Sequence, residues 1–166
     1  LPFVALIPLL FIEKFSTGEL LTGSLTALEG VGAVFGALMV SIANPKNMAF
    51  VFCTMLFTLF LAIFLSSNSP NVLSLTLFIF GYGVTSSAYS AMQSSIIYAS
   101  SDPHLRSATF SILTIAIGSG FLGALNVSWM GSFLKVSEVT QIMAIEGLAA
   151  FVLIMCYIRF WKRRQA

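Results

Sequence analysis

The sequence predicts an all-α, polytopic membrane protein, built as a bundle of transmembrane helices. Two features of its composition lead to this prediction: 58% of the 166 residues are hydrophobic, and only 8% are charged. A soluble domain carries about 25% charged residues, because its surface faces water. The third observation is that the apolar residues form long blocks, and about 20 apolar residues cross the hydrocarbon core of a bilayer. These blocks do not alternate apolar and polar residues, as the strands of a membrane barrel would.

Residues that form turns divide the chain into six apolar segments with short connections. The predicted helices cover residues 1–12, 19–43, 48–65, 71–100, 107–134 and 138–161, so residues 1–166 form one membrane domain. The first segment is too short to span a bilayer, and the chain begins on Leu1 within it. We therefore expect that this helix is truncated and that an N-terminal part of the protein precedes it.

The positions of the basic residues predict the orientation. Six of the eight fall on one predicted side of the membrane: Lys46, Arg106, Arg159, Lys162, Arg163 and Arg164. Cytoplasmic loops carry an excess of Lys and Arg, so this side and the C-terminus are expected in the cytoplasm, and Lys14 and Lys135 outside. We expect a multi-pass protein of the plasma membrane, such as a bacterial inner membrane. The basic C-terminal cluster follows an apolar helix, which is typical of a membrane-proximal segment and not of a nucleic-acid site.

The residue types needed for enzyme chemistry are nearly absent. The single His and the single Asp, His104 and Asp102, lie in the same loop, which excludes an HExxH metal site or a paired-aspartate site in this segment. No phosphate-binding GxxxxGK[ST] loop is present either. Cys53 and Cys156 lie in different apolar helices and are expected to be buried. The sequence therefore predicts neither an enzyme nor a metal or cofactor site.

We expect the Asp102–His104 turn to cap the following helix, rather than to sense pH, and Arg106 to hold the loop against the membrane surface.

Glu29 is the residue most suggestive of function. It lies near the middle of the helix 19–43, at a depth where an unpaired charge costs several kcal/mol. Glu29, Gly32 and Gly36 are three and four residues apart, so they share one helix face. Gly32 and Gly36 form a small-xxx-small pair that lets another helix approach closely. Glu29 is therefore expected to face protein, where it carries a coupling proton or meets a cationic substrate. The alternative is a protonated or hydrogen-bonded Glu that ties two helices together.

A polar and aromatic stripe runs along the helix 71–100. Tyr82, Ser86, Tyr89 and Gln93 are spaced by four, three and four residues, which keeps them on one narrow arc. Such a stripe is expected to face a cavity or another helix, not lipid. Because it contains two aromatic rings, we favour a cavity that binds a small molecule over hydrogen bonds between helices.

Small residues on the helix 107–134 predict helix packing. The residues concerned are Gly118, Ser119, Gly123 and Asn126. Glu146, in the helix 138–161, is expected to have a structural or lipid-boundary role.

The order of these features resembles the C-terminal half, helices seven to twelve, of a transporter of the major facilitator superfamily. Glycines recur along the second predicted helix, and the cytoplasmic turn after it contains Asn44 and Lys46. This is similar to the family's turn after its eighth helix. Val40 and Ser41, however, stand where the family has an acid–base pair. Gln93 precedes the turn 102–107, as in the loop between the family's tenth and eleventh helices. A third group of glycines resembles the family's eleventh helix: Gly118, Gly120, Gly123 and Gly131.

The resemblance is greatest to the drug and siderophore exporters, which include enterobactin-exporter-like and macrolide-efflux-like proteins. It implies half of a twelve-helix fold, with one substrate cavity between two halves that rock around it. It also implies proton-coupled export of a small organic molecule, with the tenth helix lining the cavity. The expected partners are the N-terminal six-helix half, the substrate and the lipid bilayer, and this half alone is not expected to transport. The alternative is a six-helix, non-transporting subunit or scaffold of another membrane complex.

Overall fold

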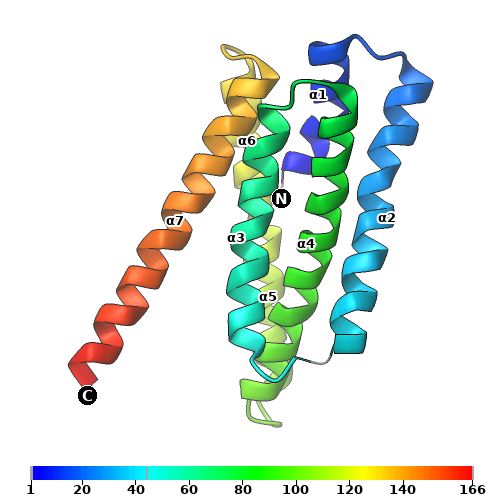
Figure 1. The fold of residues 1–166 in the computed structure, drawn as a ribbon. Helices are drawn as coiled ribbons and strands as arrows, with labels where there is room; N and C mark the ends of the chain where they lie inside the picture. The colour runs from blue at the N-terminus through cyan, green and yellow to red at the C-terminus, as the bar shows by residue number, and fades with distance from the viewer. Residues whose placement is uncertain (1, 44, 166) are drawn as a thin grey trace.

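The computed structural model describes residues 2–43 and 45–165, with side chains described as far as Phe160. This part of the chain is helical throughout apart from its connections, and contains no strand (Figure 1). The helices in chain order are α1 (Phe3–Phe15), α2 (Glu19–Ala43), α3 (Met48–Ser67), α4 (Val72–Ser100), α5 (Arg106–Gly118), α6 (Gly120–Gly131) and α7 (Val136–Gln165). Five spans are long and apolar enough to cross a membrane, with α5 and α6 together forming one of them. The predicted all-helical architecture is confirmed for the described residues.

The span predicted as one helix over 107–134 is divided at Ser119 into α5 and α6. Gly118 and Gly120 flank this residue, and glycine has a helix propensity about 1 kcal/mol poorer than alanine. The Ser119 hydroxyl donates to the carbonyl of Ala116 at 2.7 Å, and this local bond competes with the regular helical pattern. The span also ends earlier than predicted, at Gly131.

The first helix continues one turn further than predicted and ends at Phe15. Glu13 and Lys14, expected in a turn, belong to the helix because both side chains find partners on other elements. Ser16 then stops the helix in a left-handed conformation, with φ of 50°, and its N–H donates to the carbonyl of Ile12. The last helix is also longer than predicted and covers residues 136–165.

Helix α1 lies in the centre of the bundle although it is short, behind α3 and α4 in Figure 1. Its buried face is formed by Phe3, Ile7, Leu10 and Phe11, whose spacing places them on one side of a helix. The same core cluster contains residues from α3, α4 and α7: Leu59, Ala62, Ile63, Leu75, Ile79, Tyr82 and Ala144. Because α1 touches all of these helices, it fixes their spacing around the middle of the bundle.

Helices α2 and α4 pack with their backbones in direct contact. A Cβ atom added to Gly36 would lie 2.9 Å from the Cα atom of Val84 and would strike its carbonyl oxygen. From the other side, a Cβ on Gly83 would lie 3.1 Å from the backbone nitrogen of Ala33. Gly32 is equally tight against α4. Close approach of this kind is how small residues stabilise helix pairs in a membrane, through van der Waals packing.

Helix α5 is held much less firmly. None of its residues is buried, whereas α6 buries Val127 and Met130 against Leu6 of α1 and Val139 of α7. The α5–α6 span is therefore attached to the bundle mainly through α6. Its outward surface is apolar, which suits contact with lipid chains and not with water.

Polar contacts tie together the end of the bundle at which α1 stops. The Lys14 ammonium donates to the carbonyls of Ser67 at 2.7 Å and Ser69 at 3.0 Å, where α3 ends. Cations are favoured at this position, since the last carbonyls of a helix have no partner within it. The Glu13 carboxylate accepts the Val136 N–H at 3.2 Å, at the start of α7. Burial lowers the pKa of Lys14 below its usual value.

Replacing Lys14 by Met is expected to destabilise the folded chain by about 1–2 kcal/mol, because two carbonyls at the end of α3 lose their charged donor. Titration of the detergent-solubilised protein with a denaturing detergent, followed by circular dichroism, measures this. The matched control is Lys135→Met, since Lys135 is an exposed lysine at the same end of the bundle. Equal stability of the two variants would contradict a structural role for Lys14.

The connections alternate between the two ends of the bundle (Figure 1). The α1–α2, α3–α4 and α6–α7 connections lie at one end, and the α2–α3 and α4–α5 connections lie at the other with the C-terminus. Lys46 and Arg106 therefore share an end with the basic tail, as the sequence predicts. Asn44, predicted in the α2–α3 turn, lies outside the described residues. Which end faces the cytoplasm stays a prediction.

Candidate functional site

A cavity of about 700 Å³ lies among α1, α2, α4, α5 and α6, with one lining residue, Leu59, from α3. All five residues that the sequence singles out for substrate or proton binding line it: Glu29, Tyr82, Ser86, Tyr89 and Gln93. Glu29 comes from α2, and the other four come from α4. The close contact of α2 with α4 places the carboxylate-bearing turn beside the polar stripe, because Gly83 packs against the backbone of Glu29 itself.

The two tyrosines differ in how much of each ring the cavity can use. Tyr82 is only 2% exposed and its ring meets Phe3 edge-on, with the ring centroids 4.7 Å apart. Tyr89 is half-buried and its ring lies 5.1 Å from that of Phe52 on α3. Packing against phenylalanine fixes both rings in place. Tyr89 has more surface toward the cavity and is the better candidate for contact with a ligand.

The remaining stripe residues keep hydrogen-bonding capacity. The Ser86 hydroxyl donates to the carbonyl of Gly83 on its own helix at 3.1 Å, which leaves its oxygen able to accept. Gln93 lies one turn beyond Tyr89 and interacts with its hydroxyl. In the part of the chain that the structure describes, none of the four side chains forms a hydrogen bond to another helix. The alternative is that the stripe only ties helices together. No hydrogen bond of that kind is present among the described residues.

Glu29 is half-buried at the wall of the cavity. Its side chain forms no hydrogen bond or salt bridge with a residue whose placement is described, and Tyr82 is its electrostatic neighbour across the α2–α4 contact. A carboxyl group in this position is accessible from the cavity. It can bind a proton or a cation, whereas the alternative of a bond between two helices has no partner among the described side chains.

The wall opposite the polar stripe is apolar and comes from α5. Leu113 lines it, together with Ala116 and Ile117, which follow Leu113 by three and four residues. This wall could not be predicted from the sequence, because these residue types have no polar signature and are equally typical of a lipid-facing helix. Ser90 also lines the cavity, and its spacing of four from Ser86 could have identified it.

Of the residues predicted to mark packing, Gly32 and Gly36 have contacts that require a small side chain, because both approach the backbone of α4. A Cβ on Gly123 would lie 3.4 Å from the ring of Pro2, which is an ordinary contact distance. Around Gly118 nothing lies within 4 Å of the added atom. Asn126 is exposed on α6. Packing roles for Gly118 and Asn126 have no basis among the described residues and stay predictions for a partner.

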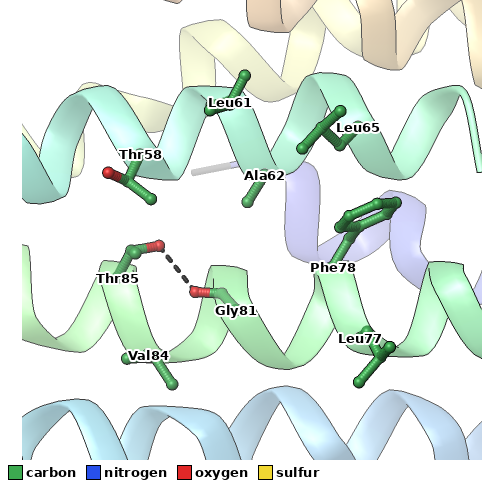
Figure 2. A pocket seen from close by; sticks show the side chains of 9 residues that line it. All are labelled: Thr58, Leu61, Ala62, Leu65, Leu77, Phe78, Gly81, Val84 and Thr85. Atoms are coloured by element: carbon green, nitrogen blue, oxygen red, sulfur yellow. Dashed lines mark hydrogen bonds between the residues drawn. The ribbon is translucent and has the colours of Figure 1, made fainter.

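A second cavity, of about 310 Å³, lies between α3 and α4 (Figure 2). Its two threonine hydroxyls are already bonded within their own helices, Thr85 to the carbonyl of Gly81 at 3.0 Å and Thr58 to that of Thr54 at 2.8 Å. The other lining residues are apolar. This cavity offers neither a charge nor an unused donor to a polar ligand, so it is a weaker candidate than the larger one.

The loop before α5 does not cap that helix as predicted. Helix α5 begins at Arg106, and its N-cap position is Leu105, which makes no side-chain cap. The Asp102 carboxylate instead accepts the N–H of His104 at 2.9 Å, which closes a local turn. The Arg106 guanidinium lies 4.0 Å from the ring centroid of Tyr98, so it joins the start of α5 to the end of α4.

The other polar or reactive residues lie away from the large cavity. Glu146 is exposed on α7. Cys156 is also exposed, contrary to its predicted burial, and Cys53 is half-buried with its sulfur 3.9 Å from that of Met155. Within the described residues no group of three or more metal-ligating side chains is found.

Comparison with models of protein families, with curated protein sequences and with solved structures finds no match for this chain. The functional assignment therefore depends on the geometry of the large cavity and on the pattern of the sequence.

Proposed function

We propose that this chain is the C-terminal half of a secondary active transporter of the major facilitator type, which exports a small organic molecule in exchange for protons. One observation carries the proposal. A cavity inside a bundle of membrane spans is lined by a single acidic side chain, Glu29, next to the polar and aromatic stripe of α4. An ionisable residue at bilayer depth that faces a cavity is typical of a substrate or proton pathway.

The two walls of the cavity define what it can bind. The α2–α4 wall offers a carboxylate, an aromatic ring and hydrogen-bonding groups, and the α5 wall offers apolar contact. This combination suits an amphipathic organic molecule of moderate size, because binding sites for such molecules are mostly apolar with a few well-placed polar groups. A bare ion would find too few ligands here.

Alternating access requires the walls to separate and to close around the substrate. In our proposal α1, α2, α3 and α4 form the rigid part, held by the glycine contacts of α2 with α4 and by the Lys14 bonds at one end. The α5–α6 span, which buries residues only through α6, is the part that adjusts. A second six-helix half supplies the remaining wall and the opposing surface.

The test uses the coding sequence upstream of Leu1 and the full-length protein that it specifies. We expect six further apolar spans. A pH gradient is then established across everted membrane vesicles that contain this protein, and acridine orange fluorescence reports it. Addition of a macrolide or a catecholate siderophore is expected to dissipate the gradient. Vesicles without the protein should keep their gradient under the same conditions. A start codon directly before Leu1 would favour the alternative of a six-helix subunit or scaffold.

Replacing Tyr89 by Ala is expected to weaken substrate binding about fivefold, since an aromatic contact contributes roughly 1 kcal/mol. The measurement is the concentration of substrate that gives half-maximal dissipation of the gradient. The control is Tyr98→Ala, which removes a tyrosine from the same helix outside the cavity. An unchanged half-maximal concentration in the Tyr89 variant would place the stripe outside the substrate path.

A further inference from the structure

The C-terminal half of α7 separates from the bundle. Phe151 still contacts α3, with its ring centroid 6.2 Å from that of Phe57, and Met155 contacts Cys53. From Val152 to Phe160 every side chain is exposed. Figure 1 shows α7 leaning away from α3 toward the C-terminus. This exposed surface of α7 lies at the end of the helix that carries the basic residues.

An open, shallow cavity of about 350 Å³ lies along this surface of α7. Its lining residues all belong to α7, and all but the last are apolar or carry a weakly polar thiol: Phe151, Val152, Met155, Cys156, Ile158 and Arg159. The apolar part lies toward the middle of the membrane span, and Arg159 lies toward its end. The cavity thus has an apolar body and a cationic mouth.

The sequence strengthens the positive charge at that mouth. Three further basic residues follow within the next five positions, with no acidic residue among the last eight of the chain. The helix backbone continues through this segment as far as Gln165, so the basic residues follow one another along a helix. A basic segment directly at the end of a transmembrane helix attracts anionic lipid head groups.

We propose that this cavity is a binding site for an anionic phospholipid, with an acyl chain along the apolar face of α7 and the phosphate at Arg159. Both parts of the site are needed for this choice of ligand. Free phosphate or an acidic peptide would use only the basic mouth, and a neutral lipid would use only the apolar body. Arginine suits the phosphate because its planar guanidinium donates two parallel hydrogen bonds to it. This inference is independent of transport.

The experiment measures lipid contact at a tryptophan that Ile158→Trp places among the residues lining the cavity. The protein also carries Trp129→Phe and Trp161→Phe, so that this is its only tryptophan, and it is reconstituted into liposomes of phosphatidylcholine and phosphatidylglycerol. Brominated acyl chains on one lipid or the other quench the tryptophan, and the ratio of the two quenching curves gives the relative affinity of the site. We expect phosphatidylglycerol to be preferred.

Arg159→Gln is expected to reduce this preference about fivefold, since one basic residue near the surface contributes about 1 kcal/mol. Arg159→Lys should keep most of it. Lys46→Gln removes an exposed charge at the same end of the bundle, away from the cavity, and is expected to leave the preference unchanged. Val152→Phe places a larger side chain in the cavity without adding a tryptophan. It should weaken quenching by both lipids.

Three results would overturn the proposal. One is equal quenching by the two lipids in the parent protein, and another is an equal loss of preference in the Arg159 and Lys46 variants, which would indicate diffuse surface charge. The third is absence of quenching by either lipid, which would mean that protein, such as a second copy of the chain, covers this face.

Discussion

Replacing Glu29 by Gln in the full-length transporter is expected to abolish proton-coupled transport without loss of the folded protein. Glutamine has the shape of a protonated glutamate but cannot release or bind a proton. Glu29 is the only acidic side chain that lines the large cavity, so no other described carboxylate can replace it there. Dissipation of the pH gradient on addition of substrate should fall to the level of vesicles without the transporter.

The matched control is Glu146→Gln. Glu146 is the other acidic residue well inside a membrane span, but it lies on the exposed surface of α7 and does not line the cavity. Transport should survive this change. Expression and gel-filtration profiles of both variants check that the protein folds. If the Glu29 variant transports as well as the parent protein across the pH range, Glu29 has a structural role instead.

The largest effect on stability is expected for a side chain added at the α2–α4 contact. Gly36→Ala places a methyl group against the backbone of Val84, with the Val84 Cα atom 2.9 Å from the new Cβ atom. A backbone cannot move aside as the end of a flexible side chain can, so the two helices must separate. Overpacking of this kind costs about 1–3 kcal/mol, and Gly36→Leu should prevent the native packing altogether.

Gly30→Ala is the control for this prediction, since the position is exposed on the same helix and an added Cβ meets nothing within 4 Å. It should be neutral or slightly stabilising, because alanine is the better helix former. Denaturing-detergent titration of the three variants gives the order directly. A Gly36→Ala variant as stable as Gly30→Ala would show that α2 and α4 do not approach as closely as described.

The residues of the candidate site could be predicted because helical spacing determines which side chains share a face. Tyr82, Ser86 and Tyr89 are three and four residues apart, and a regular helix must bring them to one side. The same reasoning found Gly32 and Gly36. It did not find Gly83, because a single glycine in a helix has no periodic pattern, and only the partner helix reveals its role.

The long-range polar contacts could not be predicted either. Glu13 reaches the start of α7 across 123 residues of sequence, and Lys14 reaches the end of α3 across more than 50. The sequence predicts a connection at both residues, because they follow the apolar segment 1–12. Their helical conformation depends on partners that the chain brings together only when it folds.

Composition and helical periodicity were enough to predict an all-helical chain with apolar spans, the bounds of those spans to within a few residues, and the side chains that share each helix face. These properties need no knowledge of neighbouring helices. The packing of the helices was needed to show that Glu29 and the stripe of α4 line one cavity, that α5 supplies its apolar wall, and that an open cavity with a basic end lies on α7. These features depend on which helix faces meet. Because lipid is as apolar as the side chains, close packing between helices determines which faces meet, and the hydrophobic pattern does not.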